Sequence, residues 1–256
     1  MPHDATTDNY AHGMDWGHGD VSIGQLTNYR QYQYDLIGDH MGKDVLEVGS
    51  GASRSFTRLI VENNSDLERM LSIEPSPILL DSYQDKGTYQ FPEIVEFQNK
   101  DIFEIEVEQS GQFDTILFIH VLEHIEDDRA ALQHAAKLLK PGGKILIQVP
   151  ALPFLFSVHD ELVGHYRRYT KKIARKAIDT ETFDIKRMWY SDMIGILGSL
   201  VFFKFRKIKL KSDKGNKVFN KQGRFYDKYL IPFQKRIEKF ITPPIGLNLT
   251  VILQKR

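Results

Sequence analysis

Two glycines and an acid stand close together in the stretch DVLEVGSGAS, residues 44–53. Glu47 lies among apolar residues, and Gly49 and Gly51 follow it with one serine between them. An acid within a buried strand costs free energy unless a partner compensates the charge. Glycine lets the main chain approach a ligand because it has no Cβ. The stretch therefore predicts a ligand-binding turn directly after a first strand, residues 43–49.

The spacing of the glycines narrows the chemistry of the ligand. A dinucleotide-binding turn reads G-x-G-x-x-G, and its third glycine allows the helix to pack closely on the strand. Arg54 stands at that third position. A P-loop, which cradles phosphates, needs a Gly-Lys-Ser/Thr ending, and the turn has none. The pattern that remains is E-x-G-x-G, which disfavours an NAD-dependent oxidoreductase.

Strand-like and helical stretches alternate along the chain. Branched apolar runs separated by helical periodicity predict a parallel sheet with crossover helices. In such a sheet ligands bind at the carboxyl ends of the strands, where the glycines fall. The expected strands are residues 43–49, 69–75, 94–102, 113–121, 144–150, 183–191 and 247–256. The expected helices are residues 53–64, 127–140, ended by Pro141-Gly142-Gly143, and 170–181, capped by Thr170.

Further motifs follow in chain order, and with them the sequence resembles the class I S-adenosylmethionine-dependent methyltransferases. Glu74 ends the second strand, and Asp101 follows the third. FDTILFIHVLEHIED and LLKPGGKILIQVP look like the family's fourth motif and its helix-to-fifth-strand segment. The resemblance covers residues 40–150 closely. It implies a Rossmann-like, doubly wound α/β fold with a seven-stranded, mostly parallel sheet, helices on both faces and acceptor-side insertions.

The resemblance implies that the cofactor is S-adenosylmethionine, which carries no phosphate and so needs no third glycine. In the family, the acid at Glu74 accepts both ribose hydroxyls in charge-assisted hydrogen bonds, and the residue at Asp101 contacts the adenine. Glu47 would order the loop or meet the ammonium group. The residues expected to bind the cofactor are Glu47, Gly49, Ser50, Gly51, Glu74, Pro75, Asp101, Ile102 and His120.

Two histidines are candidates for catalysis. His120 follows the fourth strand, at the position that faces the transferred methyl group in the family. A histidine with a pKa near ~6.5 can take a proton from an acceptor hydroxyl at neutral pH. The alternative is that His120 only lines the cofactor pocket. His159, in the insertion after the fifth strand, is the second candidate.

The segment HYRRY resembles a subgroup of bacterial methyltransferases in the type 11/23-like group. Its arginines could clamp an anionic or sugar acceptor, with the tyrosines stacking on a ring. Alternatively, the arginines pair with acids of the body such as Asp127 or Asp128. The residues expected to touch the acceptor are His165, Tyr166, Arg167, Arg168 and Tyr169.

Metal and nucleic acid are not expected as ligands. A metal site of His120, His124 and His159 is conceivable, because histidine binds divalent ions readily. The oxygen-rich clusters of Asp and Asn typical of metal-dependent methyltransferases cannot be assembled from this sequence, so no metal is predicted. The N-P-P-Y motif of nucleic-acid base methyltransferases is absent after the fourth strand, where HVLE stands.

The composition excludes disulfide frameworks and thiolate metal sites, because the 256 residues contain no cysteine. A cytoplasmic setting is therefore expected. The formal net charge is zero, yet residues 201–256 hold 15 Lys and Arg against 3 Asp and Glu. We interpret this basic stretch as a solvated surface, or as a patch that attracts an anionic acceptor or membrane headgroups.

Residues 193–221 combine the apolar run MIGILGSLVFFKF with a lysine cluster. The apolar run falls short of the ~20 residues that span a bilayer. We interpret the segment as an acceptor lid. The segment could in addition contact a membrane surface peripherally. The alternative is that its apolar run forms a core helix and the lysine-rich part a loop.

One domain is expected, with an N-terminal cap (1–40), a cofactor-binding half (41–150), an acceptor-side half with insertions (151–245) and a final strand (246–256). The expected function is methyl transfer from S-adenosylmethionine to an oxygen of a small-molecule, glycan or lipid-linked acceptor. Two alternatives remain: a non-catalytic S-adenosylmethionine-binding module, and a methyltransferase that acts on a carbon of a quinone or lipid.

Overall fold

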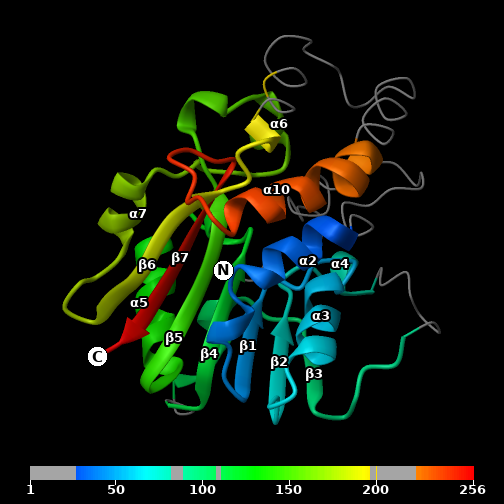
Figure 1. The fold of residues 1–256 in the computed structure, drawn as a ribbon. Helices are drawn as coiled ribbons and strands as arrows, with labels where there is room; N and C mark the ends of the chain where they lie inside the picture. The colour runs from blue at the N-terminus through cyan, green and yellow to red at the C-terminus, as the bar shows by residue number, and fades with distance from the viewer. Residues whose placement is uncertain (1–26, 82–88, 108–110, 197–199, 201–222) are drawn as a thin grey trace.

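A seven-stranded sheet in the order β3-β2-β1-β4-β5-β7-β6 forms the centre of the molecule (Figure 1). The computed structural model describes residues 27–81, 89–107, 111–196, 200 and 223–256. The strands are β1 (Asp44–Val48), β2 (Arg69–Ile73), β3 (Val95–Gln98), β4 (Phe113–Ile119), β5 (Leu139–Pro150), β6 (Phe183–Ser191) and β7 (Asn248–Lys255). Each overlaps a stretch that the sequence predicts as a strand, although β5 begins five residues before the predicted strand 144–150.

Six of the strands run in one direction, and β7 runs against its two neighbours. Strands β3, β2, β1, β4 and β5 pair in parallel in that order. Strand β7 is antiparallel to both β5 and β6 and lies between them. The carboxyl ends of β1 to β6 and the start of β7 therefore lie along one edge, which confirms the predicted doubly wound, mostly parallel sheet.

Helices and short turns connect the strands. They are α2 (Thr27–Asp35), α3 (Ser55–Asn63), α4 (Pro77–Asp81), α5 (Asp128–Leu138), α6 (Val158–Leu162), α7 (Lys171–Ala177) and α10 (Ile231–Glu238). Short turns are η3 (Gly38–His40), η4 (Ile102–Glu104), η6 (Leu122–His124), η7 (Pro153–Leu155) and the π-helical η9 (Tyr226–Leu230). The Thr170 side chain accepts from Ile173 N, 3.2 Å away, and so caps α7 as predicted.

Apolar side chains alternate between the two faces of the sheet, as the two-residue period of a strand requires. Ile116 and Phe118 of β4 belong to the core under α5 and α7, whereas Leu117 belongs to the core under α2 and α3. Ile145 and Leu146 of β5 divide in the same way. Both faces are thus covered by helices, which fixes the sheet edge as the place where a ligand can approach.

Helix α5 ends two residues earlier than its sequence predicts, which corrects the expected end at the Pro-Gly-Gly turn. Leu139 is fully buried and pairs with Phe113 of β4, so β5 already begins there. Pro141-Gly142-Gly143 lies inside the strand, where the β4–β5 register shifts between Phe113 and Thr115. Burial of Leu139 in the sheet outweighs continuation of the helix.

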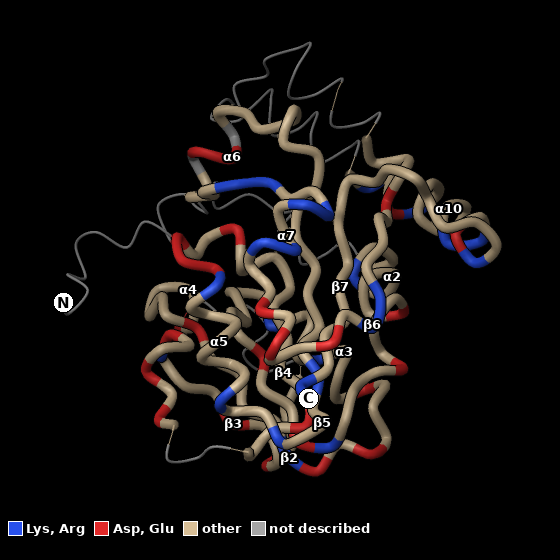
Figure 2. The backbone as a smooth tube through the Cα atoms, turned by 90° about the vertical axis from the view of Figure 1, so that its left-hand side faces the viewer, with Lys and Arg blue, Asp and Glu red and all other residues tan. Residues whose placement is uncertain are grey.

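Only part of the basic stretch 201–256 is described. Its helix α10 has basic residues in the last turn, and so does α7 (Figure 2). None of the described helices is long and apolar enough to cross a membrane. The predicted lid over 193–221 lies outside the described residues apart from 193–196 and 200, and the predicted cap is described only from residue 27.

Candidate functional site

The glycine turn after β1 needs its glycines for two different reasons. Gly49 has φ +75°, and a Cβ there would lie 2.6 Å from Cγ2 of Val121. Gly51 has φ +63°, and a Cβ there would meet nothing within 4 Å. Gly49 is thus required for packing, whereas Gly51 opens a space beside the turn. The backbone N–H groups of Gly49 and Ser50 both donate to Ile73 O, which holds the turn against the end of β2.

The Ser50 hydroxyl of this turn is buried and could bind a polar group of a ligand. Ser50 is 8% exposed, and its Oγ has no hydrogen-bond partner among the described residues. A buried hydroxyl without a partner costs free energy. Together with the open space over Gly51, it fits the polar amino acid end of S-adenosylmethionine.

Glu74 links the turn to the residues after β2. Its Oε2 accepts from Gly51 N at 2.9 Å, and its Oε1 accepts from Ser76 N at 3.0 Å. The side chain is almost fully buried. A carboxylate fixed beside the open space over Gly51 is the arrangement that a ribose diol requires, which supports the role that the resemblance gives to Glu74.

Glu47 is buried below the turn and orders it from inside. Its Oε2 accepts from Thr57 Oγ1 of α3 at 2.6 Å and from Ser72 Oγ of β2 at 2.8 Å. Burial raises the pKa of Glu47 above its ordinary value, against these hydrogen bonds. The acid therefore ties α3, β1 and β2 together, which favours loop ordering over contact with an ammonium group.

Asp101 and its neighbours close the cofactor side after β3. Asp101 Oδ1 accepts from Phe103 N at 2.6 Å and caps η4. Asn99 Nδ2 donates to Glu74 O at 2.7 Å and to Pro75 O at 3.0 Å. Ile102 is buried. The predicted cofactor residues thus lie along the ends of β1, β2 and β3, although their contact with the cofactor stays a prediction.

His120 ends β4 in an unusual backbone conformation. Its φ of +56° lies in the left-handed region, which costs free energy for a residue with a Cβ, and its N–H donates to Gln148 O at 2.8 Å. Nε2 lies 2.9 Å from Gln33 Nε2, and Nδ1 lies 3.4 Å from Glu123 Oε1. A strained residue held in this way at a sheet edge favours a functional role.

The hydrogen-bond network assigns the tautomer of His120. Arg30 Nη1 donates to Gln33 Oε1 at 2.9 Å, so the Gln33 amide presents its NH₂ group to His120. Nε2 of His120 therefore accepts, and Nδ1 carries the proton toward Glu123. In this tautomer Nε2 is the basic nitrogen, and an acceptor hydroxyl reaches its lone pair by replacing the Gln33 amide.

Glu123 lies at the centre of several imidazoles. The side chain is fully buried, and burial acts to raise its pKa. The nearby Nδ1 of His120, 3.4 Å from Glu123 Oε1, and the charges of His120, His124 and His165 outweigh burial and hold the pKa of Glu123 below its ordinary value. Sequence analysis did not single out Glu123, because its burial among these rings is a tertiary effect.

A second polar network, which sequence analysis missed, lies after β6. Asp192 has φ +64°, is buried, and accepts from Gly195 N at 3.0 Å, from Gln234 Nε2 at 3.2 Å and from the Tyr226 hydroxyl. Its own N–H donates to the Tyr32 hydroxyl at 3.0 Å. Burial raises the pKa of Asp192. We call Tyr32, Asp192, Tyr226 and Gln234 the acceptor-side network, because three of them belong to residues 151–245, the half predicted from the sequence to face the acceptor.

Two of the predicted acceptor residues are engaged inside the protein. Arg167 Nη1 pairs with Asp128 at 3.0 Å, and Arg168 Nε pairs with Asp160 Oδ1 at 2.7 Å. These pairs support the alternative in which the arginines meet acids of the body. Tyr166 is 54% exposed and remains available to an acceptor. His159 lies in α6, and its side chain is outside the described part of the structure.

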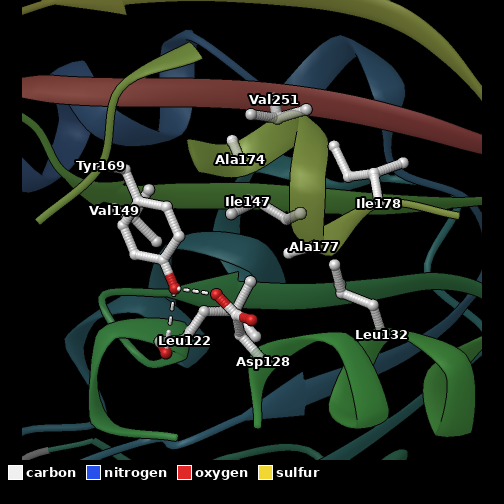
Figure 3. A pocket seen from close by; sticks show the side chains of 10 residues that line it. All are labelled: Leu122, Asp128, Leu132, Ile147, Val149, Tyr169, Ala174, Ala177, Ile178 and Val251. Atoms are coloured by element: carbon white, nitrogen blue, oxygen red, sulfur yellow. Dashed lines mark hydrogen bonds between the residues drawn. The ribbon is translucent and has the colours of Figure 1, made fainter. Parts of the chain in front are cut away.

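Tyr169 also has a structural role, beside a small cavity between the sheet, α5 and α7 (Figure 3). Its hydroxyl donates to Asp128 Oδ2 at 2.8 Å and lies 3.2 Å from Leu122 O. The cavity measures about 10 Å³ and is almost entirely apolar, so it holds one water molecule at most. It lies on the α5 face and cannot take a methyl acceptor.

Comparisons with known proteins identify the class that this fold and site define. A family model described as a methyltransferase domain matches residues 29–190. The match covers more than half of the chain, which therefore belongs to the class I S-adenosylmethionine-dependent methyltransferases. The predicted cofactor, S-adenosylmethionine, is confirmed at the level of the family. The HYRRY subgroup stays a prediction.

Individual relatives resemble parts of the chain. The ubiquinone biosynthesis O-methyltransferase of Xanthomonas oryzae pv. oryzae is 30% identical over 148 residues, which are 52% of this chain and 59% of that protein. The chain thus matches less than two thirds of that relative's length.

Solved structures share the fold at low sequence identity. An S-adenosylmethionine-dependent methyltransferase from Archaeoglobus fulgidus has a TM-score of 0.58 at 14% identity, over 91% of this chain and 95% of its own. The N-methyltransferase NodS from Bradyrhizobium japonicum, solved with S-adenosylhomocysteine, has a TM-score of 0.53 at 12% identity, over 92% and 89%. At these identities the likeness shows the fold alone.

Proposed function

We propose that the protein transfers the methyl group of S-adenosylmethionine to a hydroxyl oxygen of a small-molecule acceptor. The observation that carries this proposal is His120, whose Nε2 accepts a hydrogen bond from Gln33 at the edge of the sheet where β4 ends. The relatives from ubiquinone biosynthesis are O-methyltransferases by name, which supports oxygen as the methylated atom. Phenolic hydroxyls are therefore the first acceptors to test.

The residues of this chain divide the work of such a transfer. When bound, the cofactor supplies an electrophilic methyl group on a sulfonium. Gly51 leaves room for its amino acid end, and Glu74 accepts from its ribose. Nε2 of His120 would take the proton of the acceptor hydroxyl and so make its oxygen a stronger nucleophile toward that methyl group. No residue would be needed as an acid, because the group that the cofactor would release is a neutral thioether. Alignment of the two reactants supplies much of the rate.

Several finer features belong to this proposal. Tyr166, exposed beside the site, is the member of HYRRY that we keep as an acceptor contact. Glycan and lipid-linked hydroxyls remain within the proposed acceptor class. We also propose that residues 193–221 form a lid over the acceptor. The whole chain is proposed to be one domain.

A methyl-transfer assay tests the proposal directly. The full chain is incubated with S-adenosylmethionine and panels of phenols, catechols, sugars and isoprenoid-linked phenols, and S-adenosylhomocysteine is quantified by mass spectrometry. We expect turnover with at least one hydroxylated panel and none with its O-methylated counterpart. Stabilisation by S-adenosylhomocysteine with no turnover on any panel would instead support the non-catalytic binding module. Stabilisation by NAD alone would contradict the cofactor site.

A further inference from the structure

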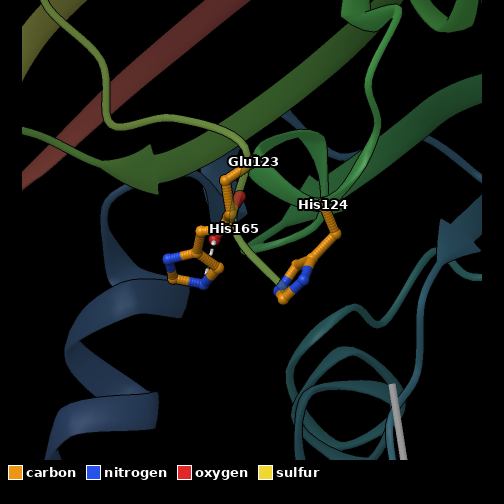
Figure 4. Close-up of side chains that lie close together, drawn as sticks. All are labelled: Glu123, His124 and His165. Atoms are coloured by element: carbon orange, nitrogen blue, oxygen red, sulfur yellow. Dashed lines mark ion pairs between the residues drawn. The ribbon is translucent and has the colours of Figure 1, made fainter. Parts of the chain in front are cut away.

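Two histidines and one carboxylate converge just beyond His120 (Figure 4). Glu123 and His124 belong to η6, and His165 follows α6. A backbone bond from Tyr166 N to Glu123 O, 2.8 Å long, brings the two segments together. One possible ligand atom from each of Glu123, His124 and His165 lies within 4.8 Å of the others.

The carboxylate at the centre is surrounded by imidazole rings but accepts no hydrogen bond from the described residues. Glu123 is 0% exposed, and neither of its oxygens accepts a hydrogen bond from any residue that the structure describes. The nearest ring nitrogens are His120 Nδ1 at 3.4 Å and His165 Nε2 at 4.0 Å. A buried carboxylate is costly unless it is paired or coordinates a metal. A cation between Glu123 and the rings would supply the missing charge.

His165 is oriented in the way that metal-binding histidines are. Its Nδ1 lies 2.9 Å from Asp160 Oδ1, and Arg168 Nε binds the same oxygen at 2.7 Å. Ser157 N donates to the other oxygen of Asp160 at 2.9 Å. An ionised carboxylate on Nδ1–H fixes the tautomer and leaves the lone pair of Nε2 directed at Glu123, as in carboxylate–histidine–metal arrangements.

We propose that Glu123, His124 and His165 bind one divalent transition-metal ion, with Asp160 as the residue that positions His165. Two imidazoles and one carboxylate suit Zn²⁺, Mn²⁺, Fe²⁺ or Co²⁺ better than Mg²⁺ or Ca²⁺, which prefer oxygen ligands alone. Metal bonds of ~2.0–2.2 Å require the three side chains to move closer together, because their ligand atoms lie up to 4.8 Å apart, with His165 Nε2 and Glu123 Oε1 separated by 4.0 Å. Water completes the coordination.

The proposed ligand set differs from the one considered from the sequence, for which no metal was predicted. His124 stays, but His165 and Glu123 replace His159 and His120. The proposal does not depend on methyl transfer, because metal binding can be measured without cofactor or acceptor.

Cobalt is the most direct probe. Untagged full-length protein is freed of metal with a chelator, titrated with CoCl₂ and followed by visible d–d absorption, and Zn²⁺ is then used to displace the cobalt. We expect saturation at one equivalent. Glu123→Gln and His165→Gln should each weaken binding at least tenfold, and Asp160→Asn should weaken it about 10- to 100-fold, as outer-shell carboxylates do.

Two controls exclude other histidines. His134→Gln changes a histidine whose ring bonds Ile105 O instead, and a triple change of His3, His12 and His18 to Gln removes the N-terminal histidines. Both should bind cobalt like the unchanged protein. Retained stabilisation by S-adenosylhomocysteine shows that a variant is folded.

A second measurement covers variants that fail to fold. In the unchanged protein, bound Zn²⁺ should protect His124 and His165 from diethylpyrocarbonate, mapped by peptide mass spectrometry, while His134 stays equally reactive. Absence of saturable cobalt binding, or undiminished binding in both Glu123→Gln and His165→Gln, would overturn the proposal. S-adenosylhomocysteine binding that persists in that case leaves the proposed function standing.

Discussion

At the ends of β1 and β2 the site is held by short connections, whereas at the ends of β4 and β6 it is held by side chains from distant parts of the chain. Gly51 N reaches Glu74 across 23 residues, and Ser76 N reaches the same carboxylate across two. On the other side, Gln33 contacts His120 across 87 residues, and Tyr32 contacts Asp192 across 160. The proposed cofactor side is therefore built by contacts near the strand ends. The proposed acceptor side is built by contacts between segments that are far apart in the sequence.

This difference predicts which substitutions should lower cofactor affinity and which should lower the rate of methyl transfer. Residues on the cofactor side contact main chain and each other near one turn, so changes there should act on cofactor affinity. Residues on the acceptor side surround His120, so changes there should act on rate.

The largest expected effect is that of His120→Ala on turnover. Removing a general base lowers the rate by about 10²- to 10⁴-fold. Since His120 lies beyond the glycine turn, the affinity for S-adenosylhomocysteine should stay within a few-fold of the unchanged protein. Kinetics with the best acceptor of the panel and isothermal titration measure the two quantities. Equal loss of affinity and rate would move His120 to the lining of the cofactor pocket.

Substitution of the two glycines should affect different quantities: cofactor affinity for Gly51 and stability for Gly49. Gly51→Val fills the open space beside the turn and should lower S-adenosylhomocysteine affinity by about 10- to 100-fold, the equivalent of overpacking by 1–3 kcal/mol. Gly49→Val places its side chain against Val121 and should instead lower the free energy of unfolding by roughly 2–4 kcal/mol, since φ and packing costs add. Urea unfolding measures the loss of stability, and isothermal titration with S-adenosylhomocysteine measures the loss of affinity, so the two methods distinguish the two effects. Cofactor binding unchanged in Gly51→Val would refute the placement of the cofactor.

A smaller loss is expected for Glu74→Gln. The change keeps the size of the side chain but replaces a charge-assisted hydrogen bond by a neutral one, which should lower cofactor affinity about tenfold. Glu96→Gln on β3 is the matched control, because Glu96 is exposed and bonds the Gln98 side chain. If both variants bind S-adenosylhomocysteine like the unchanged protein, Glu74 does not contact the ribose.

The smallest effect is expected for Tyr169→Phe. The hydroxyl bonds Asp128 and Leu122 O inside the α5 face, so its loss should lower the free energy of unfolding by about 1–2 kcal/mol. The KM for the acceptor should not change in Tyr169→Phe. Tyr166→Phe is the comparison variant, because Tyr166 is the exposed tyrosine of the same segment. A raised KM in Tyr169→Phe alone would return Tyr169 to the acceptor contacts.

The sequence predicts the seven strands and the cofactor side because those features are local. Strand periodicity, the glycine turn and Glu74 each depend on a few neighbouring residues. Gln33 and Asp192 carry no such signal, since their roles arise only when α2 and the end of β6 meet the sheet edge. The early end of α5 escaped prediction for a related reason: burial of Leu139 against Phe113 is decided by the sheet, not by helical propensity.

The position of β7 has a consequence for the order in which the chain can fold. Among the strands that the structure describes, β6 pairs with β7 alone, so it has no partner among them until β7 exists. Residues 192–247 separate the two strands along the chain. At about 5–20 residues per second of synthesis, these 56 residues take roughly 3 to 11 seconds to make. During that interval both edges of β6 are open to wrong pairing, so a nascent chain that pauses in this segment is expected to be the species that chaperones bind.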